Sequence, residues 1–292
     1  MKKRIFTCVS IAFVIVSIIS SLYAFNWPVE DFGAKNMQSY FGQLRGKLIS
    51  PSFIFENPDD VKAIGDGKLL IYMKDDVNDT SMFPSTLGNC VLISHKDDLV
   101  SVYGNLDEPT MEKNLDSKTN FSQDEKIGST GTSGFQVRVS NLEFQIFDSK
   151  NGSAINPKIF MPRTNNEIPL VLSNITLQNK NGSLFNLSEV KNLASGTYRI
   201  YQGRNSVACP YKSKVTINGV VVDELTFDTI NEENSRIYIN GKKQYLSNVI
   251  YPNSELQLLG EAVLTPGHST LGIEVADYLG NKKNISFALI IN

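Results

Sequence analysis

The stretch SNLEFQIF, residues Ser140–Phe147, alternates polar and apolar side chains and so predicts a β-strand. Its apolar members share the face that we expect to be buried: Leu142, Phe144 and Ile146. Asn141 and Glu143 lie two residues apart and share the opposite face. Two residues with this spacing suit a metal site, although neither of them is a histidine. The simpler interpretation is that they form the exposed side of an edge strand.

The composition is that of a globular protein. The chain has 292 residues, of which 41% are hydrophobic and 20% are charged. This length predicts one or two domains. The apolar content is sufficient for a packed core and excludes wholesale disorder.

The first residues have the layout of a secretory signal. Basic residues at positions 2–4 precede an apolar run over residues 5–19, and Ala24 is a suitable cleavage residue. We therefore expect residues 1–24 to be a signal peptide and the remaining chain to be exported to the periplasm or cell envelope. The alternative is an uncleaved anchor, which leaves the protein tethered to a membrane.

Charge and cysteine content limit the partners and the cross-links of the remaining chain. Removing residues 1–24 takes away three of the 28 basic residues and none of the 30 acidic ones, which leaves a net charge of −5. A nucleic-acid-binding surface needs the opposite balance, so we expect no nucleic acid as partner. Cys90 and Cys209 are far apart in the sequence. We expect two small buried side chains rather than a disulfide, although export permits one.

Short alternating runs, bounded by turn-forming residues, predict a mostly β protein. In the first half these runs are Lys68–Tyr72, Cys90–Ser94, Val100–Tyr103 and Phe135–Val139. No long stretch shows a helical period. Two polar loops, residues 74–86 and 107–126, interrupt the pattern, and loops of this length are functional segments or surface excursions.

The prolines and turn formers of residues 156–169 mark a domain boundary. Beyond it, seven runs have the strand pattern: Ile168–Leu172, Gly196–Ile200, Ser213–Ile217, Arg236–Ile239, Glu255–Leu259, Leu271–Val275 and Ile285–Leu289. Their spacing and turns such as Asn218-Gly219 predict an antiparallel, immunoglobulin-like β-sandwich. We therefore expect one domain over residues 25–164 and a second over residues 165–292. The segment Asp277–Asn281 predicts a plain turn, because one acidic side chain is too few for calcium.

A series of short motifs between Trp27 and Pro162 carries a specific resemblance. In chain order they are FGQLR (41–45), VKAIGDGKL (61–69), GNCVLISH (88–95), LVSVYGNL (99–106), IGSTGTSG (127–134), SNLEFQIFD (140–148) and AINP (154–157). Together they resemble the lysostaphin-like, or LytM-type, zinc endopeptidase domain. The resemblance implies a LytM-type β domain, a duplicated hybrid motif of the barrel-sandwich kind. It also implies an activity on peptide cross-links of bacterial peptidoglycan.

The residues that this chemistry needs are missing from the chain. The family holds zinc with His, Asp and His, and further histidines polarise the attacking water. Motif by motif, Ile49 and Phe53 fall at the first two ligands, and Asn105 falls at the catalytic histidine. Asn141 and Glu143 fall at the H-x-H pair, of which the second histidine is a ligand. At most one zinc donor survives, so the resemblance implies that zinc is lost and that the domain is catalytically inactive.

Two histidines occur in the whole chain, His95 and His268. His268 lies in the second predicted domain. His95 falls at a family position that is not a zinc ligand, and we expect it to be structural. The alternative is an active zinc endopeptidase that recruits other ligands: Asp59, Asp60, Asp66 or His95.

The expected function is that of an exported, inactive peptidase-like protein. It binds peptidoglycan peptide or regulates a cell-wall hydrolase, because the family's cleft lies between loops on a rigid sheet. The groove residues expected to contact the ligand are Arg45, Tyr103, Asn105, Asn141 and Glu143. Two alternatives remain open, the active zinc endopeptidase and a structural envelope protein without a ligand.

Overall fold

The computed structural model describes residues 24–30, 32–56, 60–74, 85–134, 140–164 and 167–292. Residues 1–23 of the predicted signal peptide, Asp59 and the predicted strand Phe135–Val139 lie outside these ranges, as does most of the loop 74–86. Among the described residues, no helix combines the length and the apolar character needed to cross a membrane.

Strands dominate the described chain, as the sequence predicts. The first half contains β1 (Met37–Ser39), β2 (Leu44–Arg45), β3 (Leu48–Ile49), β4 (Phe53–Glu56), β5 (Asp60–Lys62), β6 (Gly67–Met73), β7 (Cys90–Ser94), β8 (Leu99–Gly104), β9 (Asn120–Phe121), β10 (Lys126–Ser129), β11 (Asn141–Asp148) and β12 (Ser153–Ile155). Three short 3-10 helices accompany them in the described residues: η1 (Ala34–Asn36), η2 (Glu108–Thr110) and η3 (Pro157–Ile159).

The second half is also built from strands. They are β13 (Thr176–Asn179), β14 (Leu184–Asn186), β15 (Asn192–Leu193), β16 (Gly196–Gly203), β17 (Lys212–Ile217), β18 (Val220–Thr226), β19 (Thr229–Glu233), β20 (Arg236–Asn240), β21 (Gln244–Leu246), β22 (Leu256–Leu264), β23 (Gly267–Ala276) and β24 (Lys282–Ile291). One short α-helix, α2 (Ser247–Ile250), follows β21.

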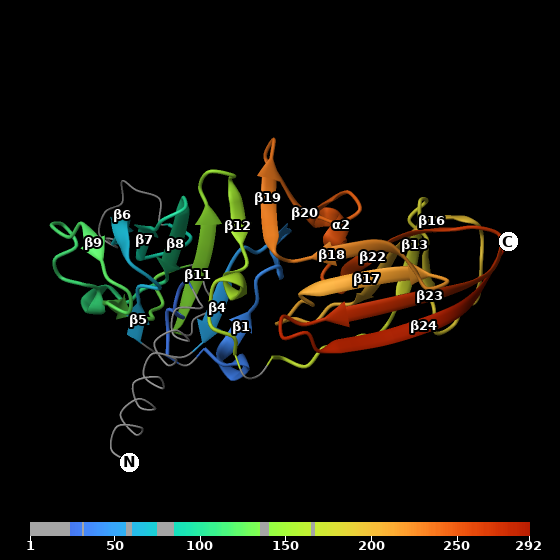
Figure 1. Cartoon of the computed structure of the whole chain (residues 1–292), viewed down its shortest axis with the longest axis horizontal. Helices are drawn as coiled ribbons and strands as arrows, with labels where there is room; N and C mark the ends of the chain where they lie inside the picture. Colours follow the sequence, from blue (N-terminus) through green and yellow to red (C-terminus); the bar gives the residue numbers. More distant parts are fainter. Residues whose placement is uncertain (1–23, 31, 57–59, 75–84, 135–139, 165–166) are drawn as a thin grey trace, which may run out of the picture.

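An eleven-stranded sheet organises the left part of the elongated molecule in Figure 1. Its main path runs β21-β20-β19-β12-β11-β8-β7-β6-β9, with β4 added to β11 and β1 added to β4. β11 is central, because β8 pairs with one of its edges while β4 and then β12 pair with the other. The backbone of β11 is therefore hydrogen-bonded along both edges.

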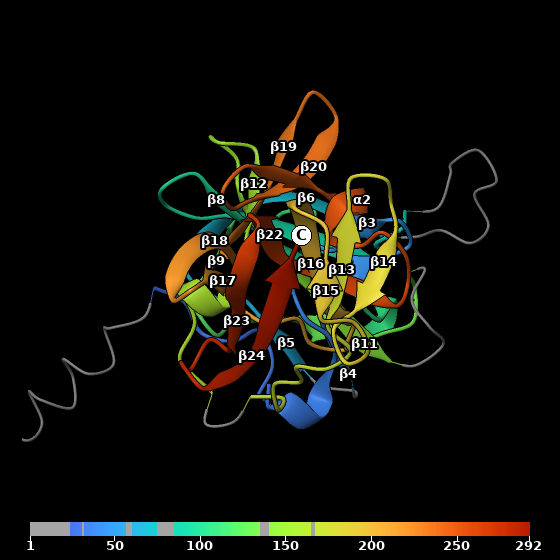
Figure 2. The ribbon, with the colours of Figure 1, turned by 90° about the vertical axis from the view of Figure 1, so that its right-hand side faces the viewer.

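The second half forms a sandwich of two sheets, which is seen end-on in Figure 2. The sheet β14-β13-β16-β22 faces the sheet β15-β24-β23-β17-β18, and all pairs except β15 with β24 are antiparallel. The turn between β17 and β18 places Asn218 and Gly219 at positive φ, 51° and 83°. Two such residues form the tight hairpin turn that an Asn-Gly pair predicts.

Two runs predicted as sandwich strands are placed differently. Ile168–Leu172 is not a strand, and Pro169 within it has no amide hydrogen to donate to a ladder. Arg236–Ile239 does form a strand, β20, but β20 joins the first sheet through the pairing of β19 with β12. The predicted boundary after residue 164 therefore does not separate the two sheet systems. By pairing with β12, β19 covers an edge that is otherwise open to other chains.

The two halves share one hydrophobic core. Tyr201, Phe227 and Tyr245 from the second half belong to the same buried cluster as Phe41 and Phe53 from the first. A second cluster fills the sandwich and includes Leu177, Ile200, Val215, Leu271 and Val275. Burial of these side chains at an interface that is continuous with the core fixes the two halves relative to each other.

Three smaller expectations are resolved by the structure. Cys90 is a free thiol that is buried, as expected, whereas Cys209 is a free thiol that is half-buried. The predicted turn at Asp277 is closed by Asn281, whose backbone and side-chain amides donate to the Asp277 carboxylate at 2.8 and 2.7 Å. The loop 107–126 contains η2 and β9 and buries three apolar side chains, so it is packed on the domain: Met111, Leu115 and Phe121.

Candidate functional site

The two faces of β11 are different in chemistry, and both are buried. Leu142 and Phe144 have no exposed surface and lie on the apolar face. Asn141, Glu143 and Gln145 lie on the opposite face and are only 0%, 2% and 8% exposed. The interpretation of Asn141 and Glu143 as the exposed side of an edge strand is therefore wrong. Arg45 and Ser52 contact Glu143 on this polar face, and Asn105 contacts Asn141.

The carboxylate of Glu143 is surrounded by hydrogen-bond donors. Ser52 Oγ donates to Glu143 Oε1 at 2.6 Å, and Gln145 Nε2 lies 3.1 Å from the same oxygen. Arg45 Nη1 forms an ion pair with Oε1 at 2.5 Å. Three side chains thus satisfy one oxygen of a buried acid, which is the condition under which burial of a carboxylate is tolerated.

Arg45 reaches this acid from a tight hairpin. β2 and β3 pair Arg45 with Leu48, and Gly46 between them has a φ of +64°, a conformation that glycine adopts without strain. The base of the hairpin is fixed from the second half, because Ile49 N donates to Ser247 Oγ at 3.4 Å. The side chain of Arg45 remains 39% exposed, whereas that of Glu143 is 2% exposed.

A second polar cluster lies at the end of β8. Asn105 adopts a φ of +65°, which asparagine tolerates better than most residues. Its Nδ2 lies 2.6 Å from Gly131 O and 2.7 Å from Asn141 Oδ1, and its Oδ1 accepts from Gly134 N at 2.7 Å. The side-chain amide of Asn105 thus holds the loop after β10, and the side-chain oxygen of Asn141 accepts from that amide. An amide so engaged has no basic lone pair with which to activate water.

The aligned ligand positions Ile49 and Phe53 do not converge with Asn105, Asn141 and Glu143. Phe53 pairs with Phe144 in the ladder and therefore lies on the apolar face of the sheet. Ile49 is 1% exposed and belongs to the same hydrophobic core. Ser52, one residue before Phe53, reaches Glu143 in their place. The motif alignment in this segment is thus displaced by at least one residue, and a one-residue slip exchanges the faces of a strand.

Tyr103 also lies away from the polar face. It pairs with Phe144, its ring centroid is 5.5 Å from that of Phe144, and it has no exposed surface. Its hydroxyl accepts from Ile64 N at 2.9 Å, and burial raises its pKa. Of the five residues predicted to line a ligand groove, Arg45 is the one with substantial exposure.

His95 has the surroundings of a structural histidine. Its Nδ1 lies 2.9 Å from Asp66 O and its Nε2 lies 2.7 Å from Ser101 Oγ. Burial lowers the pKa of His95, and the ring packs on Phe25 with 4.8 Å between centroids. Both ring nitrogens are engaged in the neutral state of the ring, which leaves neither available to bind a metal.

The alternative zinc ligands are separated as well. Asp60 forms an ion pair with Lys126 at 2.7 Å, and Asp66 accepts from Gln123 N at 2.8 Å. Asp59 lies outside the described residues. Across the part of the chain that the structure describes, no group of three His, Cys, Asp or Glu side chains is close enough to hold a metal ion.

The residues at the site therefore do not fit a zinc ion. Zinc needs three or four imidazole, thiolate or carboxylate donors around one point. Here the single carboxylate, Glu143, lies against the guanidinium of Arg45, and the neighbouring groups are amides and a hydroxyl. A cationic side chain stands beside the acid that aligns with a zinc ligand.

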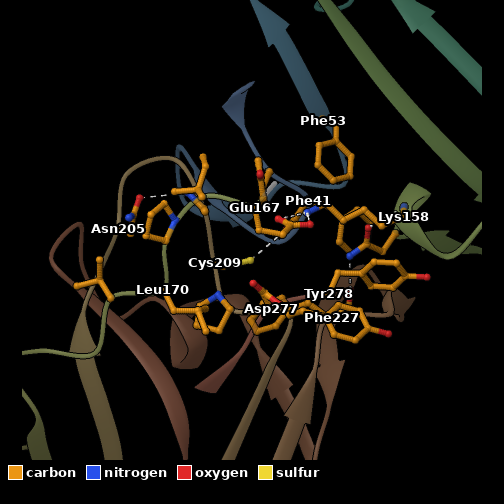
Figure 3. Close-up of a pocket in the computed structure, with 18 of the residues that line it drawn as sticks. Phe41, Phe53, Lys158, Glu167, Leu170, Asn205, Cys209, Phe227, Asp277 and Tyr278 are labelled. Carbon is orange, nitrogen blue, oxygen red and sulfur yellow. Dashed lines mark hydrogen bonds and ion pairs between the residues drawn. The ribbon is translucent and has the colours of Figure 1, made fainter. Parts of the chain in front are cut away.

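A buried polar cluster between the two halves carries no signal in the sequence and was not predicted. Lys158 Nζ lies 2.5 Å from both carboxylate oxygens of Glu167 and 4.1 Å from the ring centroid of Tyr40. Figure 3 shows this pair beside Cys209, whose Sγ donates to Phe41 O at 3.1 Å. The cavity there measures about 30 Å³, which holds one water molecule. The ion pair connects two points of the segment between the halves, and the cavity beside it is too small for a ligand larger than water.

Comparison with known proteins identifies a family for part of the chain. Residues 53–157 match the model of peptidase family M23, and a second family model matches residues 169–292. An uncharacterized protein of Treponema pallidum (strain Nichols) is 28% identical over 122 residues, which cover 39% of this chain and 80% of that protein.

Solved structures with similarity to this chain include a complex of SpoIIIAH and SpoIIQ. That match has 22% identity, covers 47% of this chain and 99% of that chain, and has a TM-score of 0.36. A zinc containing peptidase from Vibrio cholerae matches with 20% identity over 43% of this chain and 37% of that chain, with a TM-score of 0.34. Together with the ordered motifs, the family match leads to one conclusion: residues 53–157 form a domain of peptidase family M23, of the LytM type.

Proposed function

We propose that this chain is an exported, catalytically inactive relative of the M23 peptidases that binds a peptide of the bacterial cell wall. The observation that carries the proposal is the ion pair between Arg45 and Glu143 at 2.5 Å. The carboxylate that aligns with a zinc ligand is paired with a cation of the chain itself. Export is supported by the signal pattern of residues 1–24.

The chemistry of this pair argues against hydrolysis. A zinc peptidase needs a metal that polarises the scissile carbonyl and lowers the pKa of a bound water to about 7. A guanidinium supplies positive charge, but it stays protonated in proteins and cannot generate a hydroxide nucleophile. The side chains of Asn105 and Asn141 are amides, which have no basic group to accept a proton from water.

The same pair supports binding. Arg45 is anchored at one nitrogen by a buried acid, while 39% of its side chain is exposed. A guanidinium presents several donors in a fixed plane, and this suits the carboxylates of a wall peptide. The exposed residues Lys47 and Leu48 lie on the same hairpin and enlarge this exposed surface. The buried carboxylate of Glu143 holds the guanidinium of Arg45 in place.

The test is a combined assay of cleavage and retention. The full chain is purified in zinc, its metal content is measured, and it is incubated with purified peptidoglycan sacculi. We expect substoichiometric zinc, no release of peptide and retention of the protein on the sacculi. The variant Arg45→Glu is expected to lose retention, whereas Lys150→Glu, on a distant turn, keeps it.

The other outcomes identify the alternatives. Stoichiometric zinc together with cleavage of cross-links overturns the proposal in favour of an active endopeptidase. Retention on a cell-wall hydrolase, but not on sacculi, overturns the peptide ligand and identifies a regulator of hydrolases. No retention on either material identifies a structural envelope protein.

A further inference from the structure

A polar hollow in the second half of the chain is separate from the site around Glu143. It lies on the outer face of the sheet β14-β13-β16-β22, whose strands stand side by side in Figure 2, and its volume is about 520 Å³. The side chains that matter here are polar or charged: Gln178, Lys180, Thr197, Arg199, Lys243 and Glu261. A hollow of this size lies within the range of small-molecule sites.

Strand register brings the central residues of the hollow together. Gln178 pairs with Arg199 between β13 and β16, and Arg199 pairs with Glu261 between β16 and β22. Directly paired residues share a face, so these three form a row across the outer side of the sheet. The adjacent residue Ile200 points inward and is fully buried in the sandwich core. A well-packed sheet therefore holds the row in place.

Lys243 completes the hollow from the other sheet. It lies in the turn between β20 and β21, and its Nζ donates to both oxygens of Glu261, at 2.9 and 2.7 Å. The same Nζ lies 5.5 Å above the ring of Tyr245. Arg199 Nε lies 3.8 Å from Glu261, whose side chain is only 14% exposed. One largely buried carboxylate thus orients two cations.

The charge of the hollow is opposite to that of the chain. Lys180, Arg199 and Lys243 outnumber the single acid Glu261, which leaves a surplus of two positive charges. The chain as a whole has a formal net charge of −2. A concave surface of one sign concentrates ligands of the other sign. The hollow is therefore arranged to attract an anion.

We propose that this hollow binds an anionic saccharide, a sugar that bears a carboxylate or a phosphate group. The guanidinium of Arg199 and the ammonium of Lys243 suit the anionic group, since both geometries pair well with carboxylate and phosphate oxygens. The amide of Gln178 and the hydroxyl of Thr197 provide both donors and acceptors, which is what sugar hydroxyls require. The site is independent of the function proposed for the M23 domain.

The position of Lys243 connects ligand binding to the stability of the whole chain. It belongs to the sheet of the first half, whereas the row Gln178, Arg199 and Glu261 belongs to the sandwich. A ligand that contacts both sides links the two halves more firmly. Bound ligand is therefore expected to raise the unfolding temperature of the whole chain, because it binds the folded state alone.

The test uses three sugars that differ in charge. Binding of N-acetylmuramic acid, N-acetylglucosamine 6-phosphate and N-acetylglucosamine to the full chain is measured by calorimetry at low and high salt. We expect at least one of the two anionic sugars to bind at least about tenfold more tightly than the neutral one, a difference of ~1.4 kcal/mol. Added salt is expected to weaken that difference. The anionic sugar that binds more tightly identifies the carboxylate or the phosphate as the preferred group.

Variants connect the binding to the hollow. Arg199→Gln and Lys243→Gln are each expected to weaken binding of the anionic sugar by about tenfold, the loss expected for one charge-assisted contact. Lys242→Gln, which alters the neighbouring residue of the same turn, is the matched control and is expected to keep wild-type affinity. Lys180→Gln, at an exposed turn, serves as a second variant if Lys243→Gln does not fold.

Each contrary outcome overturns the proposal. Equal affinity for the neutral and the anionic sugars removes the role of charge. Unchanged affinity in Arg199→Gln and Lys180→Gln places any binding elsewhere on the chain. Absence of binding by all three sugars up to about 10 mM removes the site, because a weaker interaction amounts to less than ~3 kcal/mol. None of these results changes the zinc content or the cleavage measured for the M23 domain.

Discussion

At the scale of single residues, Glu143 is a buried acid whose Oε1 accepts from Arg45, Ser52 and Gln145. Arg45 and Ser52 precede it by 98 and 91 residues. The fold therefore supplies the partners of this acid from two distant segments. The sequence predicts the position of Glu143 on the strand, but not the identity of the groups around its carboxylate.

Arg45 is expected to stabilise the domain by neutralising Glu143. Arg45→Met leaves the buried acid without its cation, and the free energy of unfolding is expected to fall by about 2 kcal/mol, the scale of a hydrogen bond to a charged group. The double variant Arg45→Met and Glu143→Gln is expected to recover part of this loss. Urea unfolding measures both, with Lys47→Met on the same hairpin as the control. Equal stability of Arg45→Met and the wild type contradicts the prediction.

His95 is expected to make the protein sensitive to acid. Burial lowers its pKa from the ordinary 6.5, so the unfolded chain takes up a proton first as the pH falls. The free energy of unfolding is therefore expected to decrease as the pH drops below 6.5 toward the lowered pKa. Thermal unfolding at about pH 7.5 and about pH 5.5 measures the decrease. His95→Gln is expected to show a smaller decrease, and an identical pH dependence assigns the effect to other groups.

At the scale of elements, the decisive feature is the pairing of β12 with β19. Every strand of the first sheet up to β12 comes from the first half, and β19, β20 and β21 then continue the same sheet from the second half. Ile239 of β20 is fully buried in the core that the two halves share. The returning strands are part of the M23 domain's packing and not of the sandwich.

Ile239→Ala is expected to loosen the first sheet selectively. Removal of this buried side chain leaves a cavity and lowers the free energy of unfolding by about 3 kcal/mol. Hydrogen exchange is expected to become faster in β12 and β19, while β23 and β24 keep their protection. Val263→Ala, at a side chain that is 52% exposed, is the control. Faster exchange in β23 instead of β12 places β20 in the sandwich.

At the scale of the whole molecule, the segment between the halves is closed by the pair Lys158 and Glu167. Both side chains are less than a tenth exposed, at 8% and 4%, and Lys158 lies over the ring of Tyr40. Burial lowers the pKa of Lys158, and Glu167 opposes this shift. The pair thus ties both ends of the connecting segment to one shared core.

Breaking the ion pair between Lys158 and Glu167 is expected to lower the free energy of unfolding more than breaking an ion pair at the surface. Lys158→Met leaves Glu167 as an unpaired buried charge, which costs about 3–5 kcal/mol. Lys62→Met removes an exposed ion pair with Glu30 and is expected to cost under about 1 kcal/mol. Denaturant unfolding compares the two variants. Equal effects show that the Lys158 pair is not a determinant of interdomain stability.

The sequence by itself determined the local features of this protein. Alternation predicted most of the strands, Asn-Gly predicted the hairpin turn at residues 218–219, and the ordered motifs predicted the M23 domain. The sequence also shows that residues 41–69, 99–106 and 140–148 contain no histidine, since residue identity does not depend on folding.

Only the tertiary structure decided what these residues contact. The alternation of polar and apolar residues predicts that a strand has two different faces. Residues that are distant in sequence decide whether each face is buried and which sheet the strand joins. For this reason Asn141 and Glu143 are buried, Ser52 replaces Phe53 beside the acid, and β20 belongs to the first sheet. Arg45 meets Glu143 because a hairpin and a central strand pack together, and no local pattern records that contact.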